Sequence, residues 1–302
     1  MNEILASMQL CGLLPCLAGD QTALRESMEA LVSFGFPCVE ADLTSDSPEP
    51  GIWDVFALKA GIHIGAKVRT KDQARKALAA GARWVTLPAA EGMELGHPAP
   101  VFSIVKDTRE AREILTKGEG FLCSEAQCAQ ALLDQFPKAR FVISGCTDVM
   151  QRKKFLSLPQ VLAALGTLPA DAKHTKDQTE SLRREWMEIL GFSLVHIGIN
   201  GKSVQEAEET ARTFSRLLGM PYLPGTSSDY AGTIIEAMKE KGRGQNGHIG
   251  IGTDDLKRGM YYAQRAGFSF DLSSRKNDAS GRAILYYLDR EIAGFAVHFL
   301  QK

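Results

Sequence analysis

Hydrophobic and polar positions follow two different periods along the first half of the chain. Short apolar runs, such as residues 13–17 and 140–145, are separated by stretches with the spacing of amphipathic helices, such as residues 22–34. Gly35 and Gly81 stand where two of these helices should end. Strands that alternate with helices usually form a parallel sheet with crossover helices. Seven or so strands before residue 168 predict a small (β/α) barrel.

A polar segment over residues 168–179 interrupts this alternation and predicts the end of the first domain. A helix over residues 180–190 is expected after it. A chain of 302 residues is long enough for two domains with separate cores. We therefore expect a barrel over residues 1–175, a linker helix over 176–193 and a second domain over 194–302.

The second half contains an internal repeat. The tetrad His-Ile-Gly-Ile begins at His196 and again, 52 residues later, at His248. Each copy is followed by an amphipathic helical pattern, over residues 204–218 and 256–266, and then by a glycine and a β-type run. Two copies of one supersecondary unit are therefore predicted. Histidines that point inward from paired strands are one way to build a metal site.

Composition narrows the class of protein. Hydrophobic residues make up 44% of the chain and charged residues 24%, which is typical of a soluble protein. A net charge of −1 without a basic tract argues against a nucleic-acid partner. No run reaches the roughly 18 apolar residues that span a membrane, and Gly12 and Pro15 break the most N-terminal apolar stretch. Six cysteines in apolar segments of the first half are expected to be reduced and buried, which favours a cytoplasmic protein. We also expect no nucleotide cofactor.

Several segments of the first domain match a known pattern in order and spacing. These are residues 14–17 (Leu-Pro-Cys-Leu), 39–44 (Val-Glu-Ala-Asp-Leu-Thr), 84–88 (Trp-Val-Thr-Leu-Pro) and 141–146 (Phe-Val-Ile-Ser-Gly-Cys). Over roughly residues 4–168 the chain resembles the 2-keto-3-deoxy-6-phosphogluconate / 2-keto-4-hydroxyglutarate aldolases. The resemblance implies a (β/α)8 TIM-type barrel that forms trimers. It also implies that Ser144, Gly145 and Gly166 can bind a phosphate through backbone N–H groups.

Aldolases of this family need a lysine that forms a Schiff base and a carboxylate that moves a proton. Glu40 matches the carboxylate. The family's Lys-Phe-Phe-Pro-Ala-Glu is best matched by residues 120–125, which places Gly120 where the lysine should be. Leu17 and Thr44 stand in the places of two binding arginines, so we expect a barrel that has lost aldol chemistry. The alternative nucleophiles are Lys117, Lys67 and Lys106.

Residues 194–302 combine the repeat with two further polar positions. Strand alternation in residues 234–238 sets Glu236 opposite Ala237, and in residues 295–299 it sets His298 opposite Val297. With His196 and His248, this pattern resembles the vicinal oxygen chelate superfamily, which includes glyoxalase I, extradiol dioxygenases and fosfomycin-resistance proteins. The resemblance implies an α+β domain of two βαβββ modules. It further implies a divalent Zn, Fe, Mn or Ni ion held by His196, Glu236, His248 and His298, where His298 replaces a glutamate of the family.

Three functions remain open at this stage. We expect metal-dependent chemistry on a small 2-keto or 2-hydroxy acid, a substrate class inferred only from the association with an aldolase-like barrel. The first alternative is an active class I aldolase that cleaves a 2-keto-3-deoxy sugar acid to pyruvate. The second is a non-catalytic binding protein. In each case we expect a homo-oligomer, a trimer through the barrel, with no nucleic-acid or membrane partner.

Overall fold

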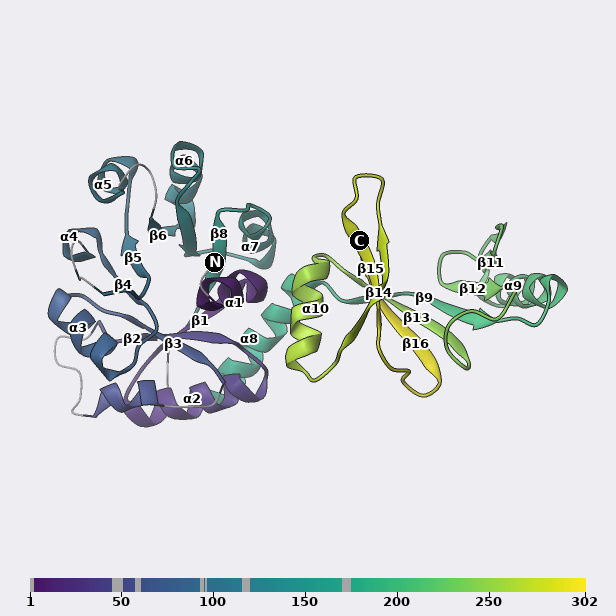
Figure 1. Cartoon of the computed structure of the whole chain (residues 1–302), viewed down its shortest axis with the longest axis horizontal. Helices are drawn as coiled ribbons and strands as arrows, with labels where there is room; N and C mark the ends of the chain where they lie inside the picture. The colour runs from purple at the N-terminus through teal and green to yellow at the C-terminus, as the bar shows by residue number, and fades with distance from the viewer. Residues whose placement is uncertain are drawn as a thin grey trace. The chain divides into compact units, whose positions relative to one another are not determined.

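The computed structural model describes residues 3–44, 51–57, 61–92, 95, 97–115, 120–169 and 175–302. The chain divides into two compact units, Met1–Ile189 and Leu190–Lys302. Both are drawn in Figure 1 and each is described by itself below. In the part of the chain so described, no helix combines the length and the apolar character needed to cross a lipid bilayer.

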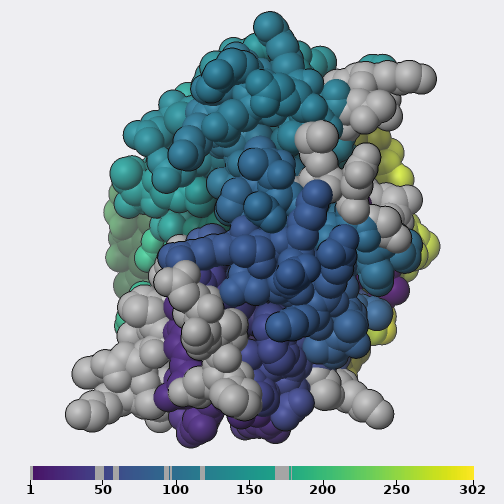
Figure 2. Space-filling model, turned by 90° about the vertical axis from the view of Figure 1, so that its left-hand side faces the viewer, coloured from purple at the N-terminus to yellow at the C-terminus, as the bar shows by residue number. Residues whose placement is uncertain are grey.

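The first unit is a closed barrel of eight parallel strands that follow one another in sequence order, which confirms the predicted barrel. The strands are β1 (Leu13–Ala18), β2 (Cys38–Asp42), β3 (His63–Lys67), β4 (Val85–Pro88), β5 (Val101–Ile104), β6 (Phe121–Glu125), β7 (Arg140–Ser144) and β8 (Val161–Pro169). The helices are α1 (Glu3–Cys11), α2 (Gln21–Ser33), η1 (Ile52–Ala57), α3 (Lys71–Ala80), α4 (Ala89–Gly92), α5 (Thr108–Ile114), α6 (Ala126–Gln135), α7 (Val149–Leu156) and α8 (Thr175–Leu190). In Figure 2 the colour changes progressively across one face of this unit, because neighbouring strand–helix pairs are consecutive in sequence.

Local sequence signals account for where the barrel helices begin and end. Helix α3 begins with a capping box, in which the side chains of Thr70 and Gln73 each accept a backbone N–H of the other residue. It ends at Gly81, whose φ of 113° is rarely adopted by other residues. Helix α1 covers one end of the barrel, where Leu5 and Met8 pack with inward-facing residues such as Phe102. The carboxyl ends of the strands lie at the other end, where barrels of this kind carry their sites.

Helix α8 packs on the barrel. Trp186 is fully buried, its ring centroid lies 4.4 Å from that of Phe36, and its Nε1 donates to the carbonyl of Cys11 at 3.0 Å. The linker helix predicted over residues 176–193 corresponds to α8 (Thr175–Leu190), which lies in the first unit up to Ile189. The polar segment expected to link the domains is partly strand, because β8 extends to Pro169; residues 170–174 lie outside the described part of the chain.

The second unit is an eight-stranded mixed sheet in the order β10-β11-β12-β9-β13-β16-β15-β14. Its elements, in chain order, are β9 (Ser193–Asn200), α9 (Val204–Leu218), β10 (Tyr222–Pro224), β11 (Ser228–Ala231), β12 (Ile235–Met238), β13 (Gly247–Thr253), α10 (Leu256–Arg265), β14 (Phe270–Asn277), β15 (Ala283–Leu288) and β16 (Phe295–Gln301). Strands β9 and β13, which carry the repeated tetrads, are antiparallel neighbours at the centre of the sheet. This arrangement is consistent with the predicted α+β domain.

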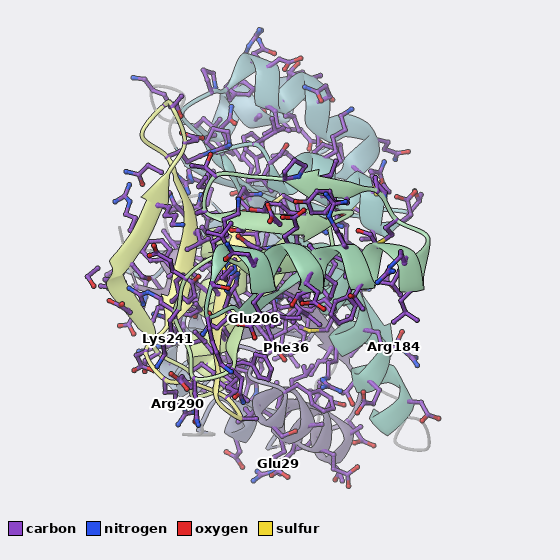
Figure 3. All side chains as sticks on the ribbon, turned by 90° about the vertical axis from the view of Figure 1, so that its right-hand side faces the viewer. Glu29, Phe36, Arg184, Glu206, Lys241 and Arg290 are labelled. Atoms are coloured by element: carbon purple, nitrogen blue, oxygen red, sulfur yellow. The ribbon has the colours of Figure 1, made fainter. Side chains whose placement is uncertain are left out.

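Helices α9 and α10 cover one face of this sheet. Ala207 and Ala211 of α9 pack on Ala237 of β12, while Leu256 of α10 lies in one core cluster with Val297 of β16. Figure 3, in which Glu206 marks α9, shows this helix lying across the strands. Since side chains alternate along a strand, the neighbours of Ala237 and Val297 project from the uncovered face. Glu236 and His298 are such neighbours.

Candidate metal centre

The two His-Ile-Gly-Ile tetrads interlock across the centre of the sheet. In the β9–β13 register, His196 is opposite Gly250 and His248 is opposite Gly198. A Cβ atom added to Gly250 would lie only 2.6 Å from Cε1 of His196, and one added to Gly198 would overlap the His248 ring. Each imidazole therefore lies across the glycine of the other tetrad. This close approach explains why both copies of the repeat need a glycine two residues after the histidine.

The four predicted ligands converge on the uncovered face. Nε2 of His196 lies 3.1 Å from Nε2 of both His248 and His298. Oε2 of Glu236 lies 3.2 Å from Nε2 of His248 and 3.7 Å from Nε2 of His196. Ligand atoms about 2.1 Å from one ion are separated by roughly 3.0–3.4 Å in octahedral or tetrahedral geometry. The three imidazoles, whose ligand atoms all lie within 4.8 Å of one another, therefore suit a single cation, and the Glu236 carboxylate lies beside two of them.

Glu236 is held as an ionised carboxylate. Its Oε1 accepts hydrogen bonds from the hydroxyls of Ser228, at 2.6 Å, and Tyr230, at 3.0 Å. Burial would raise the pKa of Glu236, but hydrogen bonds from His248, Ser228 and Tyr230 outweigh burial and lower it to about 2. Oε2 is left to face the imidazoles. Ser228 and Tyr230 are not among the residues predicted from the sequence; both lie on β11, the strand adjacent to β12.

Burial disfavours the charged form of two of the histidines, His298 and His196. His298 is only 2% exposed, and burial, followed by repulsion from His196 and His248, lowers its pKa to about 3. Burial also lowers the pKa of His196. Nδ1 of His298 is buried and has no partner among the described residues. Neutral imidazoles of His196 and His298, whose Nε2 atoms lie 3.1 Å apart, need a proton or a cation between these two atoms, so the donor set fits a metal.

Residues paired across the strands form two matching rows on this face. Directly paired residues of neighbouring strands project from the same side of a sheet. The first row runs over Tyr230 in β11, Glu236 in β12, Gly198 in β9 and His248 in β13. The second row runs over Tyr287 in β15, His298 in β16, Gly250 in β13 and His196 in β9. Each row therefore contains, in this order, a tyrosine, a predicted ligand (Glu236 or His298), a glycine and the histidine of a tetrad.

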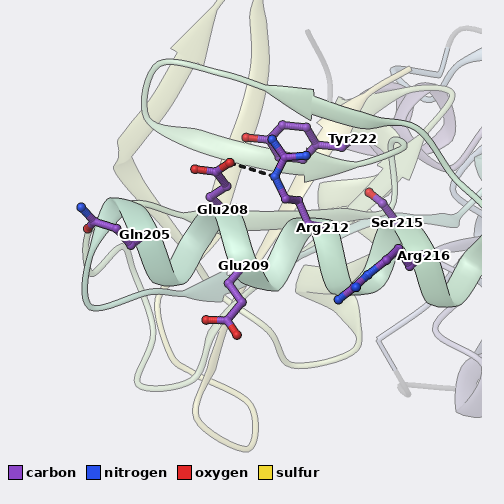
Figure 4. Close-up of a pocket in the computed structure, with 7 residues that line it drawn as sticks. All are labelled: Gln205, Glu208, Glu209, Arg212, Ser215, Arg216 and Tyr222. Atoms are coloured by element: carbon purple, nitrogen blue, oxygen red, sulfur yellow. Dashed lines mark hydrogen bonds and ion pairs between the residues drawn. The ribbon is translucent and has the colours of Figure 1, made fainter.

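A separate groove of about 460 Å³ lies along the outside of α9. Figure 4 shows Arg212 between Glu208 and Tyr222: its Nε donates to Glu208 at 2.8 Å and its Cζ lies 4.0 Å from the centre of the Tyr222 ring. None of the predicted site residues lines this groove. It belongs to the helix-covered side of the sheet, opposite the imidazole cluster.

In the barrel, the structure places Glu40 inside, at the third position of β2. Its carboxylate is 1% exposed and accepts hydrogen bonds from Nε1 of Trp84, at 3.0 Å, and from the hydroxyl of Thr86. Burial raises the pKa of Glu40, and these two hydrogen bonds offset that only in part. The Trp84 ring occupies the space beside Gly65, where an added Cβ would overlap it. A bulky ring thus fills the interior next to the predicted catalytic carboxylate.

The position of Gly120 corrects the sequence match for the missing lysine. Strand β6 begins one residue later, and a Cβ atom on Gly120 would meet the Leu115 side chain just after α5, at 2.6 Å. Phe121 and Cys123 are the β6 residues that pack in the barrel core. Gly120 therefore does not take an inward position, because inward side chains alternate from residue 121.

Among the alternative nucleophiles, Lys67 is close enough to Glu40 to act on it electrostatically. Its Nζ is 3.0 Å from Oδ2 of Asp42, the residue paired with it across β2 and β3. Burial alone would lower the pKa of Lys67, but the hydrogen bond and charge of Asp42 outweigh it and raise the pKa. Lys106 is exposed after β5, and Lys117 lies outside the described residues.

The three residues predicted to bind phosphate lie on the neighbouring strands β7 and β8 or directly after them, two residues or fewer beyond the paired residues Ile143 and Ala164. Ser144 ends β7, and Gly145 follows with a φ of 66° and open space around its Cα. Gly166 lies within β8, where an added Cβ would meet Leu182 of α8 at 2.6 Å. Gly166 thus faces the outer helix layer, and it is part of a strand where a glycine-rich loop was expected.

No protein-family model and no curated protein matches this sequence. Solved structures do match it. The 2-keto-3-deoxy-6-phosphogluconate aldolase of Zymomonas mobilis ZM4, solved with 3-phosphoglycerate, is 21% identical with a TM-score of 0.51, and the match covers 62% of this chain and 95% of that one. The corresponding aldolase from Legionella pneumophila is 21% identical with a TM-score of 0.48, over 62% of this chain and 98% of that one. The N-terminal 62% of the chain therefore has the fold of the Zymomonas mobilis aldolase.

Proposed function

We propose that the second unit binds one divalent metal ion through His196, Glu236, His248 and His298 and uses it in chemistry on a small 2-keto or 2-hydroxy acid. The observation that carries this proposal is the convergence of three imidazoles and a carboxylate, with Nε2 of His196 lying 3.1 Å from Nε2 of both His248 and His298. Their donor set suits Zn, Fe, Mn or Ni. These four side chains would hold the ion, which when bound would supply Lewis-acid stabilisation of negative charge on two neighbouring oxygens of a substrate.

We further propose that this unit consists of two βαβββ modules of the vicinal oxygen chelate type. One module is β9, α9 and β10 to β12, and the other is β13, α10 and β14 to β16. The two matching rows support this, since Glu236 and His298 occupy equivalent places, as do His248 and His196. Within such a module, Ser228 and Tyr230 orient the Glu236 carboxylate before any metal binds.

Metal content tests the proposal directly. The purified full-length protein should take up one Zn²⁺ per chain in a calorimetric titration after treatment with a chelator. His298→Ala should lower Zn²⁺ affinity at least about a hundredfold, since it removes a direct ligand. His97→Ala is the matched control, because His97 is exposed in the first unit. Failure of the wild type to bind Zn²⁺, Mn²⁺, Fe²⁺ or Ni²⁺, or equal affinity of the His298 variant, would overturn it.

For the barrel, we propose a domain that has lost Schiff-base chemistry. An imine needs a neutral amine facing the substrate. Phe121 and Cys123 occupy the inward positions of β6, and the amine of Lys67 is paired with Asp42. Borohydride reduction with pyruvate should leave the chain unmodified by mass spectrometry, whereas an active class I aldolase treated in parallel gains the adduct. An adduct on Lys67 would instead favour the alternative function, an aldolase with Glu40 as its proton carrier.

A further inference from the structure

The two rows of the metal centre contain the same kinds of residue in the same order, but their tyrosines make different contacts. In the first row, the hydroxyl of Tyr230 donates to Glu236 at 3.0 Å and so serves a ligand. In the second row, the Tyr287 ring lies 4.8 Å from that of His298 and 6.5 Å from that of His248. The Tyr287 hydroxyl has no hydrogen-bond partner among the described residues. The second tyrosine is thus beside the ligands without being used by them.

A guanidinium group covers this second tyrosine. Arg243, from the segment between β12 and β13, places its Cζ 4.7 Å from the centre of the Tyr287 ring. Its Nη1 donates to Oδ2 of Asp271 at 2.9 Å, and Asp271 is the residue paired with Tyr287 across β14 and β15. The corresponding place opposite Tyr230 is occupied by Leu223. Only the row that contains Tyr287 therefore has an aspartate, Asp271, opposite its tyrosine, and this aspartate holds the guanidinium of Arg243.

The remaining N–H groups of Arg243 donate to no residue in the described part of the chain. A second cation, Lys276 of β14, is near enough to act electrostatically on His298. The negative charges nearby are already engaged, since Asp271 also accepts from Ser273 and Glu236 accepts from Ser228 and Tyr230. The row that contains Tyr287 thus has N–H donors of Arg243 without a described partner, and the positive charges of Arg243 and Lys276, near the imidazole cluster.

We propose that Arg243 and Tyr287 bind the carboxylate of a metal-chelating monocarboxylic acid, a 2-hydroxy or 2-keto acid. This inference rests on the proposed metal-binding function of His196, Glu236, His248 and His298. Such an acid offers the metal its 2-oxygen and one carboxylate oxygen, which leaves the other carboxylate oxygen for a charged donor. A guanidinium held by an aspartate and stacked on an aromatic ring is preorganised for that task.

Two probes that differ only in charge test this inference. Glycolate and its neutral amide, glycolamide, both present a hydroxyl next to a carbonyl oxygen, but only glycolate is an anion. The Co²⁺-loaded full-length protein would be titrated with each and followed by its visible absorption, with Co²⁺ affinity measured first. Arg243→Gln should weaken glycolate binding about tenfold or more, and leave both glycolamide binding and Co²⁺ affinity unchanged. Tyr287→Phe should weaken glycolate binding by a smaller factor.

Arg282→Gln is the matched control, because Arg282 forms an ion pair with Asp278 at 3.1 Å in the turn between β14 and β15. It should bind glycolate like the wild type. Equal glycolate affinity of the wild type and the Arg243 variant, with Co²⁺ bound to both, would overturn this inference and leave the metal centre standing. Loss of Co²⁺ from the Arg243 variant would overturn it too, because Arg243 would then be supporting the ligands. A wild type without Co²⁺ would overturn both proposals.

Discussion

At the scale of single residues, Gly250 sets how closely His196 can lie on the sheet. Gly250→Ala would place a methyl group 2.6 Å from Cε1 and 2.8 Å from Nε2 of His196. The imidazole would have to move away from His248 and His298, so Zn²⁺ affinity should fall about tenfold or more. Calorimetric titration of the chelator-treated protein measures this.

Gly242→Ala is the control for the general effect of adding a methyl group to a glycine of this unit. Its nearest contact would be Oδ1 of Asn200, at 3.2 Å, away from the four ligands. That variant should bind Zn²⁺ like the wild type. If Gly250→Ala also binds Zn²⁺ with unchanged affinity, the glycine has no part in positioning the histidine.

Glu40 should make the stability of the first unit depend on pH. Burial raises its pKa from the ordinary value of 4.5, so the folded state keeps the proton to higher pH than the unfolded state does. The stabilisation from a protonated Glu40 is fully present below about pH 4.5 and is lost as pH rises through the raised value. Relative to Glu40→Gln, the wild type should therefore lose stability as pH rises above about 4.5. Urea unfolding across this range measures the difference.

Asp42→Asn provides a control of opposite sign. Burial would raise the pKa of Asp42, but hydrogen bonds from Thr44 and Lys67 outweigh it and lower the pKa. Asp42 therefore contributes stability above its ordinary pKa, and that contribution is lost as pH falls. Equal pH dependence of the Glu40 variant and the wild type would mean that the Glu40 carboxyl is solvated in the folded protein.

At the scale of elements, α8 should contribute to the stability of the barrel unit. Trp186→Ala removes a fully buried ring that contacts Phe36 and donates to the Cys11 carbonyl. We expect a loss of about 3–5 kcal/mol in the free energy of unfolding of this unit, measured with urea. Glu188→Ala, at an exposed position of the same helix, should change it little. A small effect of the Trp186 substitution would mean that α8 links the units without stabilising the barrel.

At the scale of the whole molecule, we predict a trimer formed through the barrel. The basis is the resemblance of the first unit to aldolases of trimeric type, whose fold it has. Light scattering should give three times the mass of one chain at micromolar concentration. A monomer at that concentration would contradict the prediction, and a dimer would point to another interface.

Much of the fold was predictable from local patterns. Alternating strand-like and helical runs indicated a barrel, because the buried face of each strand and each helix leaves apolar residues at regular intervals in the sequence. Asp255, one of the residue types that favour helix N-caps, begins α10, and its side chain accepts the backbone N–H of Arg258. The packing of α8 was not predictable, because a buried Trp186 depends on which surface the helix meets. For the same reason, Gly120 was placed inside the barrel on a sequence match although its Cα faces Leu115.

The candidate ligands were predictable as residue types, whereas their surroundings were not. The sequence by itself determined that a repeat presents His196 and His248, and that strand period sets Glu236 and His298 opposite apolar neighbours. Only the tertiary structure decided that these four side chains meet within hydrogen-bond distance. The physical reason is that periodicity determines which face of a strand a side chain occupies, while strand order and register determine its neighbours. Arg243, which reaches Tyr287 from a loop without any period, could be found only in the folded chain.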